Sequence, residues 1–137
     1  MKIMIADDFK AIRSAVAGIL SRHAGWEVCG EAENGPDAVQ KAKDLHPDLV
    51  LLDISMPGMD GLRAARLIRE SVPSTKILIL SHHDPTQLLV DARRSGADGC
   101  IDKSRIAADL VPTIARLESQ APVPINGGPQ NEFSRKN

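Results

Sequence analysis

Carboxylate side chains stand directly after two short apolar segments of this chain. Asp7 and Asp8 follow Lys2–Ala6, and Asp53 follows the run Leu49–Leu52. Carboxylates placed close together either shift their pKa values or hold a cation. Ligands that are all oxygen favour a hard ion such as Mg²⁺. A carboxylate such as Asp53 can also act as a nucleophile toward a phosphoryl group.

Two further polar residues follow apolar segments later in the chain. Ser81 ends one such segment, and Lys103 closely follows another. A hydroxyl donor and an ammonium group, together with a bound cation, would form a receptor for a phosphoryl group. Each residue also has an ordinary alternative, because an aspartate can cap a helix, a serine can fill space and a lysine can be a solvated charge. Their joint placement favours a site.

Five short apolar segments alternate with five segments of helical periodicity. The expected strands are Lys2–Ala6, Glu27–Ala32, Asp48–Asp53, Lys76–Ser81 and Gly99–Ile101. This alternation predicts an α/β fold with a doubly wound, five-stranded parallel sheet of the flavodoxin-like order 2-1-3-4-5. That order sets the first and third strands side by side, so all three carboxylates should meet at the carboxyl edge of the sheet.

The expected helices start or stop at Pro, Gly, Asn or Ser. The first helix is expected to end near Gly25, and the second to start at Asn34-Gly35-Pro36 and stop before Pro47. The third is expected to stop before Pro73, the fourth to start at Pro85 and end at Gly96, and the fifth to start after Ser104. The expected buried face of the first helix is Ile12, Ala15, Val16 and Ile19. Pro112 lacks a backbone donor, which predicts a kink or a delayed start in the fifth helix.

The length of the chain favours a single domain, and its small net charge bears on the partners that it can bind. The chain has 137 residues, a net charge of −1 and a sequence pI near 6.4. We expect a domain over residues 1–120 and a flexible tail over 121–137, where periodicity is lost. The charge gives no bulk electrostatic case for nucleic acid or an anionic membrane. With neither a membrane-length apolar run nor a secretion-like start, a cytoplasmic location is expected. Cys29 and Cys100 lack metal-like spacing, so we expect buried thiols.

Taken in order, several motifs resemble the receiver domain of two-component response regulators over about residues 2–118. The motifs are Met4-Ile5-Ala6-Asp7-Asp8, Pro47-Asp48-Leu49-Val50-Leu51-Leu52-Asp53, Met56-Pro57-Gly58-Met59-Asp60-Gly61, Ile79-Leu80-Ser81 and Gly96-Ala97-Asp98-Gly99-Cys100-Ile101-Asp102-Lys103. The segment Trp26–Ala32 and the last motif are closest to the subfamily that usually carries a carboxyl-terminal helix-turn-helix.

The resemblance implies a role for each residue of the expected site. Asp53 would accept phosphate from a histidine kinase and become a 4-aspartylphosphate. The residues implied to hold Mg²⁺ are Asp8, Asp53, the backbone carbonyl of Ser55 and, through water, Asp7. Lys103 would hold the phosphoryl oxygens, and Ser81 would move in to bond one of them.

The resemblance also implies a signalling module rather than an enzyme, with self-catalysed phosphoryl transfer and autodephosphorylation as its only chemistry. The implied partners are a histidine kinase or phosphotransfer protein and an output protein that binds the surface of the fourth helix, fifth strand and fifth helix. A homodimer could form on phosphorylation. No helix-turn-helix pattern follows residue 118, so we expect neither nucleic-acid binding through this chain nor membrane binding.

Two positions depart from the family or lie beside its site. Cys100 stands three residues before Lys103, where the family commonly has Tyr or Phe. A small thiol should stay buried in both states and cannot signal through a large ring movement. His82 and His83 follow Ser81, and a loop-surface role is favoured over a metal or phosphorelay role. The resemblance places Ser55 and His83 beside the path of the attacking water.

Two other functions fit the predicted topology less well. A phosphohydrolase with an aspartate nucleophile usually needs a second carboxylate two residues later, where this chain has Ser55. A nucleotide- or flavin-binding protein needs glycines or hydroxyls after the first strand to cradle a phosphate. That loop is the acidic Asp7-Asp8-Phe9-Lys10 here.

Overall fold

The computed structural model describes residues 1–82 and 85–120, with the side chains of residues 85–89 outside the description. Strands and helices alternate through these ranges, as predicted. The strands are β1 Lys2–Ala6, β2 Glu27–Ala32, β3 Leu49–Asp53, β4 Lys76–Ser81 and β5 Gly99–Asp102. The helices are α1 Lys10–Leu20, α2 Gly35–Leu45, α3 Gly61–Ser71, α4 Pro85–Arg94 and α5 Ile106–Ser119.

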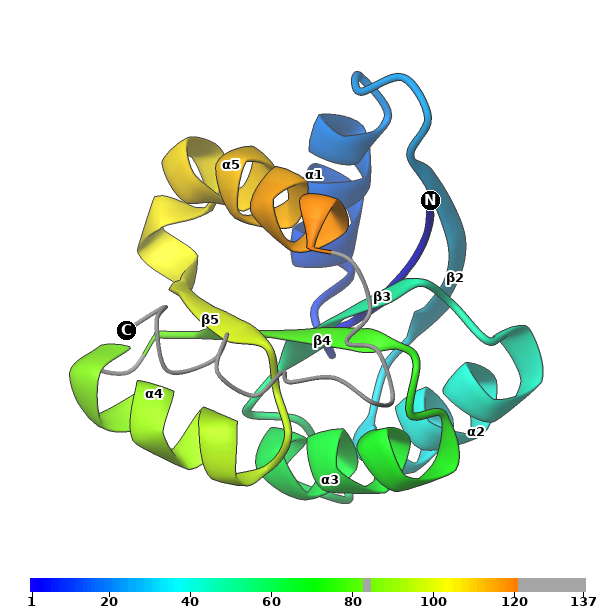
Figure 1. Cartoon of the computed structure of the whole chain (residues 1–137), viewed down its shortest axis with the longest axis vertical. Coiled ribbons are helices and arrows are strands. Elements are labelled where there is room, and N and C mark those ends of the chain that lie inside the picture. The colour runs from blue at the N-terminus through cyan, green and yellow to red at the C-terminus, as the bar shows by residue number, and fades with distance from the viewer. Residues whose placement is uncertain (83–84, 121–137) are drawn as a thin grey trace.

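The five strands form one parallel sheet in the order β2-β1-β3-β4-β5, which confirms the predicted fold class. Helices α1 and α5 cover one face of the sheet, and α2, α3 and α4 cover the other (Figure 1). Strands β1 and β3 are neighbours, with Ala6 opposite Leu52. Asp7 and Asp53, which follow Ala6 and Leu52, therefore lie at the same edge of the sheet.

Strand β3 is the centre of the apolar core, and all five of its residues are buried. Leu49 and Leu51 pack with α1 and α5, whereas Val50 and Leu52 pack with α2 and α3. Burying a leucine or valine side chain stabilises a fold by about 1.5–3 kcal/mol. The register with β1 and β4 sets Leu52 opposite Ala6 and Asp53 opposite Leu80, which places Asp53 at the rim of the sheet.

The starts and ends of the helices agree in part with the boundaries predicted from Pro, Gly, Asn and Ser. Asn34 caps α2 by accepting a hydrogen bond from the Asp37 N–H at 2.8 Å, as expected. Gly96, just beyond α4, has a φ of +94°, a conformation that favours glycine. The first helix ends at Leu20 rather than near Gly25, because tight turns occupy residues 20–26.

The buried face of α1 differs from the predicted one. Val16 is buried and Ile12 and Ile19 are half-buried, but Ala15 is exposed. Arg13 is buried in its place, at 8% exposure. The buried positions of the helix are 13, 16 and 20, and the Arg13 guanidinium is hydrogen-bonded there to Asp7 and Glu31.

The start of α5 also differs from the prediction. Ser104 does not cap the helix, because it lies inside a 3₁₀ turn over Lys103–Arg105. Asp102 accepts a hydrogen bond from the Ser104 N–H at 2.9 Å, which starts that turn. Helix α5 then runs unbroken through Pro112, which removes one backbone hydrogen bond without delaying the start of the helix.

The two cysteines are half-buried, so the expectation of buried thiols is met only in part. Cys29 lies in β2 and Cys100 in β5, the two edge strands of the sheet. An edge strand is covered less completely than a central one, which leaves part of each thiol accessible. Burial nevertheless raises the pKa of both thiols above the usual value.

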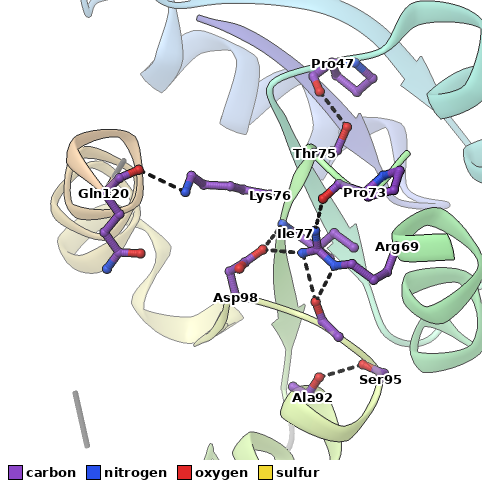
Figure 2. A network of polar contacts seen from close by, with 11 residues as sticks. Pro47, Arg69, Pro73, Thr75, Lys76, Ile77, Ala92, Ser95, Asp98 and Gln120 are labelled. Atoms are coloured by element: carbon purple, nitrogen blue, oxygen red, sulfur yellow. Dashed lines mark hydrogen bonds and ion pairs between the residues drawn. The ribbon is translucent and has the colours of Figure 1, made fainter. Parts of the chain in front are cut away.

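A polar network ties the helices together at the amino-terminal edge of the sheet (Figure 2). Arg69 of α3 donates from Nε to the Gly96 carbonyl at 3.0 Å and from Nη1 to the Pro73 carbonyl at 2.6 Å. Its Nη2 lies 2.6 Å from a carboxylate oxygen of Asp98. The same oxygen accepts from the Ile77 N–H at 2.8 Å. This network lies at the edge opposite to Asp53.

No helix within the described ranges is both long enough and apolar enough to cross a bilayer. The tail expected over 121–137 and the residue His83 lie outside the described residues. The domain boundary expected at residue 120 stays a prediction.

Gly61, the first residue of α3, predicts a measurable constraint on the end of β3. A Cβ atom at this position would overlap the Asp53 carbonyl oxygen and lie 2.5 Å from the Ile54 Cα atom. We expect Gly61→Ala to lower the free energy of unfolding by about 1–3 kcal/mol, because backbone must shift to accept the methyl group. Chemical denaturation provides the measurement.

Gly18→Ala is the matched control for this substitution. Gly18 lies in the middle of α1, and a Cβ atom there would meet nothing within 4 Å. Alanine is favoured over glycine in a helix, so this variant should be more stable than the wild type by about 0.5–1 kcal/mol. Equal stabilities for the two variants would contradict the close approach of Gly61 to β3.

Candidate functional site

A buried lysine joins two buried carboxylates at the carboxyl edge of the sheet. Lys103 Nζ lies 2.8 Å from Asp7 Oδ2 and 3.0 Å from Asp53 Oδ1. The side chains of Lys103, Asp7 and Asp53 are 5%, 0% and 3% exposed. They come from the ends of β1 and β3 and from the turn after β5. Charges so far from water persist only where they neutralise one another.

The pKa values of this group are shifted by burial and by the neighbouring charges. Burial raises the pKa of Asp53, and the hydrogen bonds from Lys103 and the Ser55 N–H offset this only in part. The charge of Asp7 raises the pKa of Asp53 further. Burial would lower the pKa of Lys103, but hydrogen bonds and charge attraction from the two carboxylates outweigh it and hold the pKa above its usual value. Lys103 is therefore a cation at neutral pH.

Asp8 adds a third carboxylate beside this pair. One oxygen from each of Asp7, Asp8 and Asp53 lies within 4.8 Å of the others. Apart from its ion pair with Lys103, the buried Asp7 Oδ2 has no hydrogen-bond partner among the described residues. Three carboxylates against one lysine leave excess negative charge, and the ligand atoms are all oxygen. This donor set fits a hard divalent ion such as Mg²⁺.

The loop between β3 and α3 holds Ser55 at the mouth of the site. The Ser55 N–H donates to Asp53 Oδ1 at 3.2 Å. The Ile54 N–H donates to the Leu80 carbonyl of β4 at 3.1 Å, and the Gly61 N–H donates back to the Ile54 carbonyl at 2.8 Å. These bonds fix the loop backbone on both sides of Ser55. The exposed Ser55 is thereby kept beside Asp53.

An open cleft of about 350 Å³ lies over these groups. Its described lining residues are Asp8, Phe9, Ile12, Asp53, Ser55, His82 and Lys103. Sequence analysis missed Phe9, which is 63% exposed, and assigned Ile12 to the core. Their position immediately after the acidic pair, three residues apart, was the available signal. His82 is an exposed residue of the rim.

Ser81 is placed at the same edge but behind the cleft. It is the last residue of β4, is 1% exposed and pairs in register with Asp102. It is not among the described residues that line the cleft. Cys100 packs against the apolar cluster under α2, α3 and α4 instead of facing the carboxylates. The structure thus gathers Asp7, Asp8, Asp53, Ser55 and Lys103 and keeps Ser81 adjacent.

Arg13 is a second residue that sequence analysis missed. Its Nη1 donates to the Asp7 carbonyl at 2.7 Å, and its Nε donates to the Glu31 carboxylate at 2.8 Å. The available signal was its spacing, since residues 13, 16 and 20 share one face of a helix. A charged residue on an otherwise apolar face points to a buried partner.

Comparison with known proteins agrees with this geometry. Residues 3–115 match the family model described as the response regulator receiver domain. The transcriptional regulatory protein LnrK of Bacillus subtilis (strain 168) is 36% identical over 119 residues, which cover 87% of this chain and 54% of that protein. The oxygen regulatory protein NreC of Staphylococcus haemolyticus (strain JCSC1435) is 38% identical, covering 97% and 63%. The chain spans between about half and two thirds of these relatives.

Solved structures give the same result. The response regulator domain of CheB from Thermotoga maritima superposes with a TM-score of 0.81 at 26% identity, covering 89% of this chain and 98% of that one. A LuxR-family two-component response regulator from Aurantimonas sp. SI85-9A1 has a TM-score of 0.80 at 31% identity, covering 85% and 83%. The fold, the motifs and these matches together show that the chain belongs to the response regulator receiver domain family.

Proposed function

We propose that Asp53 is the phosphoacceptor of a two-component phosphorelay and that Asp8 is the main additional ligand of the Mg²⁺ ion that assists the transfer. The observation that supports this most directly is the contact of Lys103 Nζ with both Asp53 and Asp7 beneath an open cleft. The lysine, the carboxylates and the cleft together provide the positive charge, the ligands for a metal ion and the space that a transferred phosphoryl group needs.

The ion would be held by Asp8, Asp53 and the backbone carbonyl of Ser55, with Asp7 acting through water. When bound, Mg²⁺ neutralises charge on the phosphoryl oxygens and on the carboxylates. Asp7 keeps its contact with Lys103 and so restrains the ammonium group. The raised pKa of Asp53 reflects a carboxylate that is poorly compensated by the protein alone.

In the proposed transfer, a carboxylate oxygen of Asp53 attacks phosphorus while the bond from phosphorus to the donor nitrogen or oxygen breaks. Both contacts of the carboxylate, from Lys103 and from the Ser55 N–H, fall on Oδ1. They fix the rotation of the carboxylate and leave Oδ2 to attack. Lys103 then donates to a phosphoryl oxygen, and Ser81 moves from its buried position to bond another. Hydrolysis of the aspartyl phosphate resets the switch.

The partners and the location are parts of the same proposal. A CheY from Borrelia burgdorferi, solved as a CheX–CheY–BeF₃–Mg²⁺ complex, superposes with a TM-score of 0.82 at 26% identity. That relative supports binding of a protein partner and of a phosphoryl mimic with Mg²⁺. We infer a histidine kinase or phosphotransfer protein as the donor, an output protein that binds α4, β5 and α5, homodimerisation on phosphorylation, and a cytoplasmic location.

The first prediction concerns the acceptor. With acetyl phosphate and Mg²⁺, the wild type should gain the mass of one phosphoryl group, and Asp53→Asn should gain none, because an amide is not a nucleophile toward phosphorus. Asp109→Asn is the matched control, since Asp109 pairs with Arg105 and neither residue lines the cleft, and it should react normally. Phosphate found on His82 or His83 with Asp53 unmodified would refute the assignment.

The second prediction concerns the metal. Asp8→Asn should weaken Mg²⁺ binding by at least about tenfold, or about 1.4 kcal/mol, and by more than Asp7→Asn does, because Asp7 is engaged by Lys103. Mg²⁺ titration followed by amide chemical shifts is the measurement, with NaCl of equal ionic strength as the control. Equal affinities for the wild type and Asp8→Asn would make the acidic pair structural.

The third prediction concerns pH and stability in the absence of Mg²⁺. Because the pKa of Asp53 is raised in the fold, the stability it contributes is present at low pH and is lost as pH rises through that raised value. At pH 7 the ionised carboxylate is a cost, so Asp53→Asn should unfold at a temperature no lower than the wild type. Added Mg²⁺ should raise the unfolding temperature of the wild type only. If Asp53→Asn unfolded at a much lower temperature than the wild type, the prediction would be wrong, because the ionised carboxylate would then stabilise the fold at pH 7.

The fourth prediction concerns how the signal leaves the site when Cys100 stands where the family commonly has Tyr or Phe. Beryllofluoride should change amide shifts mainly over residues 53–61 and 81–92, because Cys100 is too small to exchange between exposed and buried positions. The raised pKa of Cys100 keeps its thiolate fraction low at neutral pH, so alkylation should be slow with and without beryllofluoride. Alkylation that becomes fast only in the activated state would show that β5 moves.

A further inference from the structure

Arg13 is a buried charge at the base of the acidic pair. It is 8% exposed and contacts the ends of two strands, donating from Nη1 to the Asp7 carbonyl at 2.7 Å and from Nε to Glu31 Oε1 at 2.8 Å. A guanidinium cannot be deprotonated inside a protein, so its burial depends on these partners. Neither contact belongs to the phosphoryl-binding groups described above.

The contact with Asp7 acts on the backbone from which Asp8 extends. The Asp7 carbonyl and the Asp8 N–H belong to one planar peptide group. The following peptide group, between Asp8 and Phe9, is held as well, because the Phe9 N–H donates to Asp7 Oδ1 at 2.9 Å. With both planes held, the direction in which the Asp8 side chain leaves the backbone is set before any ion arrives.

Glu31 holds the other side of the guanidinium. Its side chain is 45% exposed, and its backbone carbonyl accepts from Lys41 Nζ at 2.5 Å. The planar guanidinium reaches a carboxylate on β2 and a carbonyl after β1 at the same time, which a single ammonium cannot do with the same geometry. Arg13 therefore links the ends of two adjacent strands below the site.

We propose that Arg13, oriented by Glu31, is a positioning residue for the Mg²⁺ site, fixing the Asp7–Asp8 peptide so that the Asp8 carboxylate faces Asp53. The inference rests on the proposed function, because it assumes that the three carboxylates hold Mg²⁺. Residues that orient metal ligands in this way typically change metal affinity by about 10–100-fold when they are mutated.

A purely electrostatic role for Arg13 makes the opposite prediction. A fixed positive charge close to three carboxylates competes with a bound cation. If charge were its only effect, Arg13→Met would bind Mg²⁺ more tightly than the wild type, and Arg13→Lys would bind it equally well. The positioning role requires that both variants bind Mg²⁺ more weakly, with Arg13→Lys carrying the argument because it keeps the charge.

The experiment is Mg²⁺ titration of the full chain, followed by the amide shifts of Asp8 and Asp53. We expect about tenfold weaker binding for Arg13→Lys. We also expect shifted Asp8 resonances in its Mg²⁺-free spectrum, because the peptide plane is no longer held. Glu31→Ala, at a half-exposed position that tolerates truncation, should weaken binding more than Glu31→Gln, whose amide oxygen can still accept from Arg13.

Arg69→Lys is the matched control. Arg69 also bonds backbone carbonyls and a carboxylate, at the opposite edge of the sheet (Figure 2). This variant should lose stability to a similar extent in chemical denaturation, yet it should bind Mg²⁺ as the wild type does. A general loosening of the fold would weaken binding in both lysine variants.

The possible results separate the two proposals. Mg²⁺ binding by the wild type, together with wild-type affinity in Arg13→Lys, would overturn the positioning role and leave the proposed function intact. A wild type that does not bind Mg²⁺ would overturn both. Equal weakening in Arg13→Lys and Arg69→Lys would also overturn the positioning role, since stability alone would then explain the loss.

Discussion

The structure depends on the contact between one buried ammonium group and two buried carboxylates. Lys103 Nζ touches both Asp7 and Asp53, and none of the three side chains is more than 5% exposed. Each charge would be costly to bury alone, and Lys103 offsets part of that cost for both carboxylates only when three separate parts of the chain meet. The fold must therefore bring the ends of β1, β3 and β5 to one place.

The sheet meets this requirement through its order and register. Strand β3 lies between β1 and β4 and pairs in register with both, and its apolar residues are buried on both faces. Gly61 lets α3 begin against the backbone of β3, so the loop that carries Ser55 stays short and close to Asp53. The apolar core and the position of the charges are thus set by the same interactions.

Two arginine networks support the sheet at opposite edges. Arg69 joins α3 to the segment before β5 at the amino-terminal edge, and Arg13 joins β1 to β2 at the carboxyl edge. The first network lies far from the acidic groups, whereas the second bonds directly to the backbone of Asp7. This difference in place is the reason why we propose a role at the site for Arg13 and not for Arg69.

The sequence by itself determined the alternating strands and helices and the polar residues that end the strands, because hydrophobic periodicity and strand-end positions are local properties. The strand order followed because 2-1-3-4-5 is common for five such units, and with it the edge at which the polar residues collect. It did not determine the burial of Arg13, the half-exposure of Cys29 and Cys100, or the start of α5, where a 3₁₀ turn capped by Asp102 precedes the helix. Those features depend on what packs against each residue: a carboxylate from another strand, the incomplete cover of a sheet edge, and the turn that brings Lys103 to Asp53. Only the tertiary structure brings these partners together, so only the tertiary structure could decide them.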